Sequence, residues 1–293
     1  MIDSSVIVDK VTRNFTFGCL LCILMILTSA QCTEAVKNQS ADSGCPATRD
    51  IPAGMACIPS GEFIYGSMNA KWADEHPQVK VYISAFLIDK YEVTTADYQK
   101  CVAAGKCANV ISNYVQMRGA NQPQLKVSWF EARDYCRVQG KRLPTEAEFE
   151  KASRGTAGDT YPWGNETANC RLAVIQNETG RGCTDRFGVP GSTSEVGSRP
   201  AGYYGLFDMA GNAHEWVNDW YAPDRQKCGA ECLGKDPAGP CGGKDVCPGY
   251  TEKVIKGGSW YWDADWARAA KRRAYIPANR PPHHFGFRCA RSL

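Results

Sequence analysis

The chain has 293 residues, a formal net charge of +3 and 43% apolar residues. That length provides one large domain or two ordinary ones, and the apolar content excludes an intrinsically disordered chain and a polytopic membrane protein. The small net charge, with no run of clustered lysines and arginines, argues against a nucleic-acid partner.

The N-terminal segment predicts export. Two basic residues precede the apolar run 15–27, which has the length of a signal-peptide core and is too short for a membrane span. Small residues suit cleavage after Ala30, and residues 1–31 are assigned to the signal. Cys32 follows at once, so a lipoprotein signal with a lipid on Cys32 is the alternative. We therefore expect an outer-envelope lipoprotein, or a periplasmic or extracellular protein, that meets a membrane only through such a lipid.

The fifteen cysteines fit an oxidising compartment, where disulfides persist. With Cys19 and Cys22 in the signal and Cys32 lipidated, the remaining number is even, so all of them could pair. Residues 32–50 are polar and predict a flexible tether before a folded domain over 51–293. The cysteines that we expect in disulfides include Cys45, Cys57, Cys101, Cys107, Cys170 and Cys183.

Two segments predict strands and three predict helices. Ile58–Ser67 is typical of a short strand pair punctuated by glycine, and Val79–Ile88 of one strand that enters a core. A first helix should begin at Thr94 and end near Gly105. Capping boxes predict the starts of two more helices, at Ser128 with Glu131 and at Thr145 with Glu148.

The carboxylates of the last two helices are interpreted as caps and a solvated face rather than as catalysts. They are Glu131, Asp134, Glu146, Glu148 and Glu150. Beyond Asp159, glycine, proline and aromatic residues dominate, which predicts loops and short strands. Four cysteines in a later insert lack the tight spacing of structural zinc sites, so we expect two disulfides, of open pairing. These cysteines are Cys228, Cys232, Cys241 and Cys247.

The stretch Tyr204–Trp216 (YGLFDMAGNAHEW) combines aromatic anchors with two glycines and the carboxylates Asp208 and Glu215. Its pattern fits neither an amphipathic helix nor an alternating strand. Glycines between acidic residues suit a backbone that folds around a hard cation such as Ca²⁺, which takes oxygen ligands. A glycine-rich turn between two core anchors is the alternative.

Between about Ile58 and Arg291 the chain carries, in order, IPSGEFIYGS, FLIDKYEVTTADYQKC, VSWFEARDYCRVQGKRLPTEAEFEKASRG, YPWGN, YGLFDMAGNAHEWVNDW, KGGSW and FGFRCAR. This succession resembles the formylglycine-generating enzymes, or sulfatase-modifying factors. The resemblance implies a single α+β domain related to the C-type lectin fold, with little regular secondary structure, bound calcium and disulfide staples. It also implies a disulfide between Cys136 and Cys289.

The family's calcium ligands can be carried over by position. The first set maps onto Asp208, Gly211, Ala213 and Glu215. The second set begins at an asparagine and the next carbonyl, here Asn169 and Cys170, with further ligands expected near 185–187. The resemblance therefore makes calcium the expected cofactor.

The family's catalytic pattern does not carry over. Its enzymes oxidise a sulfatase cysteine to formylglycine with molecular oxygen, using copper(I) held by the cysteine of GGSxxC and a second cysteine five residues later. Trp262 and Ala267 occupy these positions in GGSWYWDADWA, so copper, which needs soft thiolates, is not expected. Related oxygenases bind iron through histidines, but the H-x-x-x-H-x-E spacing is missing, and His283 and His284 are interpreted as part of a surface loop.

The residues after the GGS motif lead to three functional hypotheses. The first is an exported, calcium-stabilised module that binds a protein, peptide or carbohydrate. Its groove would be lined by Trp260, Trp262, Asp263, Asp265, Trp266 and Arg268. The alternative for these aromatic residues is burial in the core. The second is an oxidoreductase that converts a protein cysteine to formylglycine, or performs a related oxygen-dependent oxidation, at a non-standard site. The third is a structural part of an envelope assembly.

Overall fold

The computed structural model describes residues 43–69, 71–183, 191–281 and 283–293. The compact unit among them spans Gly44–Leu293. The predicted signal and Cys32 lie outside the described residues. In the described ranges, no helix has both the length and the apolar character needed to cross a membrane.

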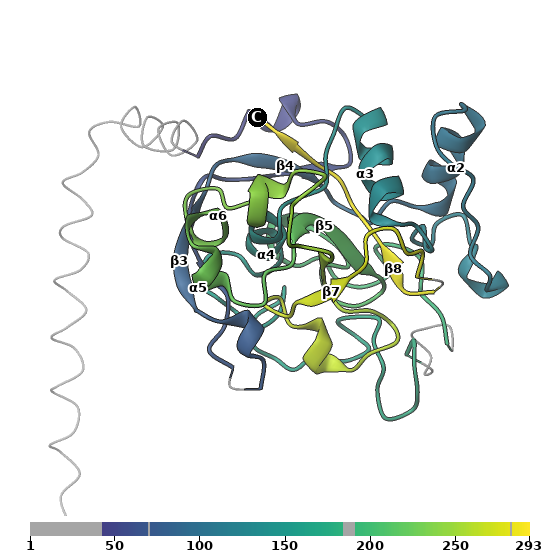
Figure 1. Cartoon of the computed structure of the whole chain (residues 1–293). Helices are drawn as coiled ribbons and strands as arrows, with labels where there is room; N and C mark the ends of the chain where they lie inside the picture. Colours follow the sequence, from purple (N-terminus) through teal and green to yellow (C-terminus); the bar gives the residue numbers. More distant parts are fainter. Residues whose placement is uncertain (1–42, 70, 184–190, 282) are drawn as a thin grey trace, which may run out of the picture. The chain divides into compact units, whose positions relative to one another are not determined.

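Three small sheets and three α-helices of at least two turns form the described unit (Figure 1). The first sheet has the order β1 (Met55–Ile58), β4 (Phe86–Asp89), β9 (Ala290–Ser292), and the second pairs β2 (Gly61–Tyr65) with β3 (Val79–Ile83). The third has the order β7 (Arg273–Tyr275), β6 (Lys253–Lys256), β5 (His214–Trp220), β8 (Phe285–Gly286). Only β5 and β8 pair in parallel among these described strands. The predicted α+β class is confirmed.

Two strand predictions need correction. The predicted strand pair over 58–67 is wrong, because β1 pairs with β4 and β2 pairs with β3. The single strand predicted over 79–88 divides at Ser84, whose backbone N–H donates to Asp236 Oδ1 at 2.5 Å. The chain thus leaves one sheet and enters another, which apolar periodicity alone does not reveal.

The helix predictions are confirmed. Helix α2 spans Thr95–Ala103, α3 spans Trp129–Val138 and α4 spans Glu146–Arg154. Thr94 caps α2, and both capping boxes are formed. The shorter helices are α5 (Arg225–Cys228) and α6 (Ala230–Leu233), with 3₁₀ turns at η1 (Thr48–Asp50), η2 (Ala73–Glu75), η3 (Val115–Met117), η4 (Tyr203–Gly205), η5 (Pro240–Gly243) and η6 (Ala264–Ala267).

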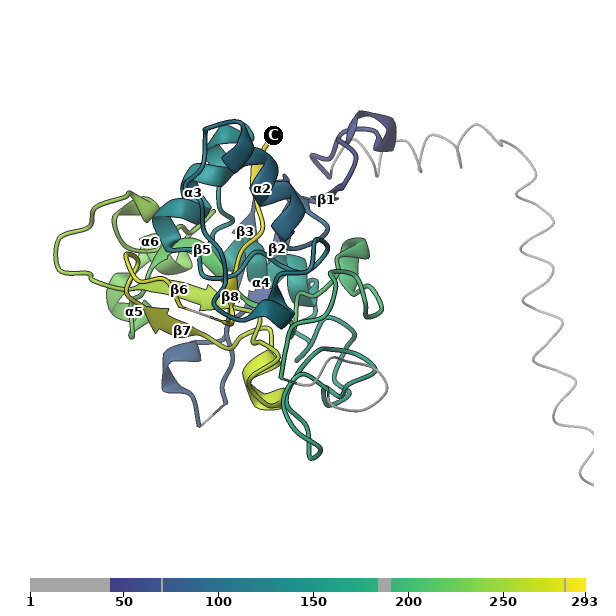
Figure 2. The same ribbon diagram turned by 90° about the vertical axis from the view of Figure 1, so that its right-hand side faces the viewer.

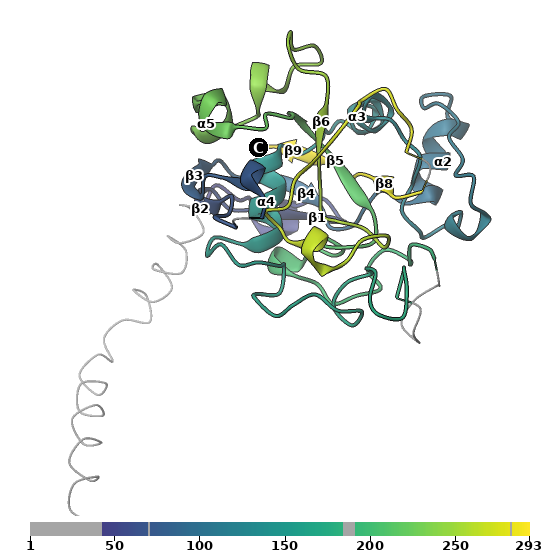
Figure 3. The ribbon, with the colours of Figure 1, turned by 60° about the horizontal axis from the view of Figure 1, so that its bottom comes forward.

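Helix α4 is buried along its whole length and contacts β2, β5 and β6, near the centre of the unit (Figures 1 and 3). The interpretation of Glu146 and Glu150 as part of a solvated face is therefore wrong. Glu146 pairs with Arg272 at 2.6 Å, and Glu150 accepts from Lys256 at 2.9 Å and from Arg154 at 3.0 Å. Burial raises the pKa of Glu146, but Arg272 and Lys256 outweigh this effect and lower it to about 2.

Six disulfides staple the described unit. The predicted Cys136–Cys289 bond joins α3 to the segment before β9, across 153 residues of sequence. The four cysteines of the later insert, whose pairing was left open, form two local bonds, Cys228–Cys232 and Cys241–Cys247. The other bonds are Cys45–Cys57, Cys101–Cys107 and Cys170–Cys183. Through Cys45 and η1, the end of the predicted tether belongs to the compact unit.

The loops between α4 and β5 and the turn after β6 lie at the same end of the unit in Figures 1 and 2. The residues of the predicted calcium sites and of the predicted binding groove come from these segments. At this end, β5 begins at His214 and β6 ends at Lys256. The Gly211 N–H donates to the Gly257 carbonyl at 2.8 Å, which ties the glycine loop to the GGS turn.

Candidate ligand-binding site

The glycine loop before β5 holds the residues of the predicted first calcium site. Asp208 has a φ of 54° and Gly211 a φ of 82°, and a Cβ at Gly211 would lie 2.6 Å from the Val174 carbonyl oxygen. Only glycine fits there without strain, so the loop turns back sharply. This turn places the carboxylates of Asp208 and Glu215 inside the protein, at 6% and 0% exposure.

A third buried carboxylate lies beside them, and the three form what we call the acidic cluster (Glu92, Asp208, Glu215). Glu92 accepts from the Ala213 backbone N–H at 2.9 Å and from Asn212 Nδ2 at 2.6 Å. Glu92 therefore braces the same loop that carries the predicted ligands. Sequence reasoning missed its role, although it lies in the family segment FLIDKYEVTTADYQKC.

Two arginines act on the acidic cluster, Arg288 directly and Arg199 through its charge on Asp208. Arg288 forms a bidentate pair with Glu215, at 2.7 and 2.8 Å. Burial raises the pKa of Glu92, the charges of Asp208 and Glu215 raise it further, and Arg288 lowers it. Burial also raises the pKa of Asp208 and of Glu215. The described cluster is thus short of positive charge, which a divalent cation would supply.

The chemistry of the loop suits calcium if backbone carbonyls take part. Within the described ranges, no three histidine, cysteine, aspartate or glutamate side chains converge to hold a metal ion by themselves. The predicted set of Asp208, Glu215 and the carbonyls of Gly211 and Ala213 is a hard oxygen set of the kind that calcium uses. Calcium at this loop stays a prediction.

The second predicted set is only partly described. Cys170 is bonded to Cys183, and its carbonyl accepts from Arg199 Nε at 2.8 Å. Asn169 is half-buried, and its Oδ1 accepts from the Arg171 backbone N–H at 3.0 Å. Residues 185–187, where further ligands are expected, lie outside the described ranges. This second calcium site also stays a prediction.

The GGS turn brings Trp260 into the core rather than into a groove. Gly258 has a φ of 75°, and a Cβ there would lie 2.8 Å from Ala267 Cα, so the turn packs tightly against η6. Trp260 is 5% exposed, and its Nε1 donates to the His283 carbonyl at 2.7 Å. For Trp260, the alternative of a core residue is therefore confirmed.

The next tryptophans do gather, and with a third that sequence reasoning missed they form what we call the tryptophan cluster (Trp72, Trp262, Trp266). Trp262 and Trp266 stack with ring centroids 4.8 Å apart, and Trp72 meets Trp266 edge-on at 5.5 Å. Lys271 Nζ lies 3.0 Å from the Trp72 ring centroid, and burial lowers the pKa of this lysine to about 8. Trp72, Trp266 and Lys271 line a cavity of about 470 Å³. All three tryptophans are half-buried, so a ligand can reach them.

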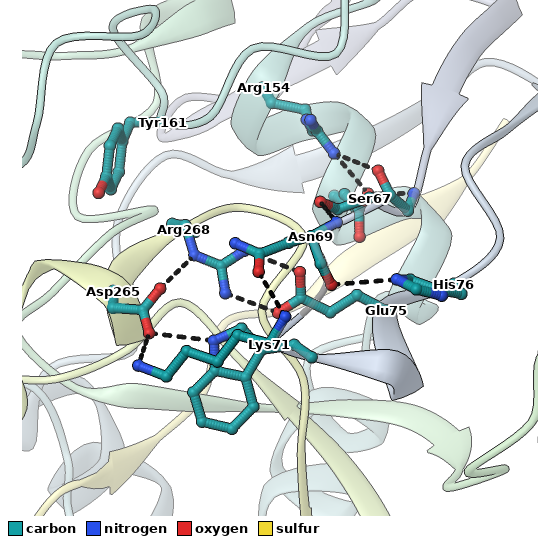
Figure 4. A network of polar contacts seen from close by, with 12 residues as sticks. Ser67, Asn69, Lys71, Glu75, His76, Arg154, Tyr161, Asp265 and Arg268 are labelled. Atoms are coloured by element: carbon teal, nitrogen blue, oxygen red, sulfur yellow. Dashed lines mark hydrogen bonds and ion pairs between the residues drawn. The ribbon is translucent and has the colours of Figure 1, made fainter.

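An ion-pair network holds this cluster in place (Figure 4). Arg268 lies between two carboxylates, with bonds of 2.7 and 2.8 Å to Glu75 and of 2.7 Å to Asp265. Asp265 also accepts from Lys71 at 2.8 Å and from Trp72 Nε1 at 3.0 Å. Burial raises the pKa of Asp265, but these hydrogen bonds outweigh it and lower the pKa to about 2.

Of the polar residues predicted for the groove, Arg268 and Asp265 are therefore structural. They fasten η2 to η6 and fix Trp72 against Trp266. Asp263 is exposed, and its Oδ1 accepts from the Asp265 backbone N–H at 3.1 Å, as the cap of η6. Of the tryptophans of the predicted groove, Trp262 and Trp266 are half-buried in the tryptophan cluster with Trp72, and their contact with a ligand stays a prediction.

The interpretation of His283 and His284 as part of a surface loop is wrong for His284, which is 9% exposed, while His283 is half-buried. The two imidazoles lie 4.4 Å apart, and His284 lies 6.0 Å from His214, which is 1% exposed. The β5–β8 pairing brings these residues together, because the His214 N–H donates to the His284 carbonyl at 2.8 Å. Spacing along the sequence gave no sign of this contact.

The positions expected for copper ligands are occupied by apolar groups. Trp262 belongs to the tryptophan cluster, and Ala267 is fully buried beside Gly258. Every cysteine within the described ranges is in a disulfide. The described part of the chain therefore offers no free thiolate pair for copper(I).

Small sheets, few helices and six disulfides in the described residues are the features that the resemblance to the sulfatase-modifying factors implies. The family model of the sulfatase-modifying factor enzyme 1-like domain matches residues 42–293. The chain belongs to this family.

Individual relatives agree with that placement. The formylglycine-generating enzyme of Bos taurus is 30% identical over 317 residues, which cover 90% of this chain and 81% of that protein. The serine/threonine-protein kinase pkn1 of Chlamydia pneumoniae is 32% identical over 267 residues, which cover 85% of this chain. This chain spans only 39% of the length of that longer protein. Among solved structures, PvdO from Pseudomonas aeruginosa matches with a TM-score of 0.65 and 25% identity, covering 82% of this chain and 94% of that chain.

Proposed function

We propose that this protein is an exported, calcium-stabilised binding module that does not generate formylglycine. The observation that carries the proposal is the occupation of both thiolate positions by Trp262 and Ala267, beside an otherwise intact family scaffold. Copper(I) chemistry needs soft thiolate ligands, and a tryptophan and an alanine provide none. The proposed role of the domain is therefore to bind a ligand rather than to oxidise a substrate.

The tryptophan cluster supports binding. Large aromatic side chains held rigidly at a partly open surface provide much contact area at little entropic cost, and they dominate the energy of many interfaces. The Arg268 network ties Trp72 to the turn that carries Trp266, and Trp262 stacks on Trp266 at 4.8 Å. The proposed ligand is a protein, a peptide or a carbohydrate.

The direct test of the missing activity uses the purified mature protein, copper(I), oxygen and a sulfatase-type CxPxR peptide. We expect an unchanged peptide mass and no stoichiometric copper in the protein. An authentic formylglycine-generating enzyme, run in parallel, is the positive control. Conversion of the peptide thiol to an aldehyde would overturn the proposal.

The calcium part of the proposal rests on the acidic cluster, where two arginines, Arg288 and Arg199, act on three buried carboxylates. A bound divalent cation would supply the missing charge and stabilise the folded state by mass action. Metal analysis of the purified protein should find calcium. A protein purified without chelators that carries no calcium would contradict this part.

A further inference from the structure

One buried amine lies in the wall of the cavity beside the tryptophan cluster. Lys271 is 4% exposed, and it lines the cavity of about 470 Å³ together with Trp72 and Trp266. Its Nζ lies 3.0 Å from the Trp72 ring centroid and 4.6 Å from that of Trp266. No residue within the described ranges forms a hydrogen bond or an ion pair with this amine.

The other buried lysines of the described ranges have oxygen acceptors. They are Lys151, Lys253 and Lys256, and each Nζ donates to a protein oxygen, at 2.6, 2.7 and 2.9 Å respectively. Such bonds offset the cost of taking an ammonium group out of water. Lys271 lacks this compensation from the protein and lines a cavity instead. A molecule in the cavity can therefore reach its amine.

The charges near Lys271 do not fix it as an ammonium group. The carboxylates among them are already engaged: Asp74 accepts from a tyrosine hydroxyl at 2.9 Å, while Glu75 and Asp265 pair with Arg268. Burial is the largest influence on the pKa of Lys271 and lowers it; Arg268 lowers it too, and Asp74, Glu75 and Asp265 raise it. The resulting pKa is about 8, against an ordinary value of 10.5. At about pH 8, roughly half of this amine is unprotonated, compared with less than about 1% of an ordinary lysine.

The rest of the cavity wall also disfavours the charged form of the amine. Lys71, Arg272 and Arg273 line the same cavity, so like charges surround Lys271 there. Two of them have carboxylate partners, Lys71 at 2.8 Å and Arg272 at 2.6 Å. Arg273 has no carboxylate partner within the described ranges, so its positive charge is not offset by a direct ion pair.

An unprotonated lysine amine is a nucleophile, and burial in an apolar site is one way in which proteins generate it. The two indole faces attract the ammonium form of Lys271 and so hold the amine in place. The Trp72 side of the wall is fixed in turn, because its Nε1 donates to Asp265 at 3.0 Å. A positioned amine beside a cavity of this size suits a covalent reaction with a small electrophile.

We propose that Lys271 captures a small aldehyde in this cavity as a Schiff base. The unprotonated Nζ attacks the aldehyde carbon, and a C–N bond forms while the electron pair of the carbonyl π bond moves to the oxygen, which takes up a proton. The nitrogen lone pair then expels the hydroxyl group, and the C–O bond breaks. Both amine protons leave with the carbonyl oxygen as one water molecule, and the imine remains. The step needs no oxidant and no reductant.

This site goes beyond the proposed function, which is the binding of a protein, a peptide or a carbohydrate. The two proposals are tested on different molecules, since aldehyde capture is measured at Lys271 and formylglycine formation is measured in the CxPxR peptide. Failure of either proposal therefore leaves the other standing.

The test is reductive trapping on the protein purified from the full chain. The protein is incubated with a limiting amount of glyoxylate and with sodium cyanoborohydride, which reduces an imine to a stable carboxymethyl amine, and each modified lysine is quantified by peptide mass spectrometry. Lys80 is the control within the same molecule, because its side chain is 72% exposed. We expect Lys271 to be modified at least roughly tenfold faster than Lys80 at about pH 8. The ratio of the two rates should fall as the pH rises from about 7 to about 10, because Lys271 gains little further unprotonated amine above its own pKa.

A charge variant checks that the cavity controls the reaction. Asp74→Asn removes the carboxylate whose charge most favours the ammonium form, so it should speed the modification of Lys271 and leave Lys80 unchanged. Glu166→Gln, at a carboxylate whose side chain is 62% exposed, is the matched control and should change neither rate. Unfolding in guanidinium chloride should abolish the preference for Lys271. No adduct at Lys271 in the folded protein, a rate no higher than that of Lys80, or a preference that persists in guanidinium chloride would each overturn the proposal.

Discussion

Replacing Arg268 by glutamine should remove a large part of the protein's stability. The Arg268 side chain is 9% exposed and Glu75 is fully buried, and the two form a bidentate pair at 2.7 and 2.8 Å. Removing the arginine charge leaves the Glu75 carboxylate inside the protein without its partner. Breaking a buried pair in this way costs about 3–5 kcal/mol. We expect a loss of that size in the free energy of unfolding.

The assay is guanidinium chloride unfolding with the disulfides kept oxidised, followed by tryptophan fluorescence and circular dichroism. Arg280→Gln is the matched control, because Arg280 pairs with Glu131 at the surface, where its side chain is 52% exposed, and such pairs contribute less than about 1 kcal/mol. The double variant Arg268→Gln with Glu75→Gln should lose less free energy of unfolding than the sum of the losses of the two single variants. A loss for Arg268→Gln no larger than that of the control would refute the role of this network.

Three further predictions concern calcium, pH and the N-terminus. Chelation of calcium, Asp208→Ala or Glu215→Ala should each lower the melting temperature, and an unchanged value would contradict the calcium site. The folded-state pKa of Glu146, about 2, lies below its ordinary value of 4.5, so the stability it contributes is present above pH 4.5 and lost as the pH falls toward 2. This loss in the free energy of unfolding is on the order of 3 kcal/mol. The Glu146→Gln variant should not show this loss when its acid unfolding is measured. Mass spectrometry of the mature N-terminus should find either a lipid on Cys32 or a chain that begins at Gln31 after cleavage behind Ala30; an unprocessed terminus would rule out export through this signal.

Local signals in the sequence predicted the parts of the fold that depend on local chemistry. The capping boxes at Ser128 and Thr145 fixed the starts of α3 and α4, because they satisfy backbone N–H groups within one turn. Cys101 and Cys107, both expected in disulfides, likewise close a short local loop with each other. These features depend on residues only a few positions apart.

Long-range features escaped prediction because partners far apart in the sequence create them. Glu146 looked like a solvated carboxylate until α4 was found to be surrounded by β2, β5 and β6, which brings Arg272 to it. Trp72 lies against Trp266 where Arg268, through Glu75, and Asp265, through the Trp72 indole, tie their two turns together. A local sequence pattern does not indicate contacts between residues that lie far apart in the chain.

The order of strands in the first sheet governs when this domain can fold. β4 pairs on one side with β1 and on the other with β9, which consists of three of the last four residues of the chain. During vectorial synthesis, β1 and β4 emerge early, and one edge of β4 stays open until β9 has also been made. The first sheet is therefore completed late in the synthesis of the described domain, and a variant without β9 would leave an unpaired strand edge exposed to neighbouring chains.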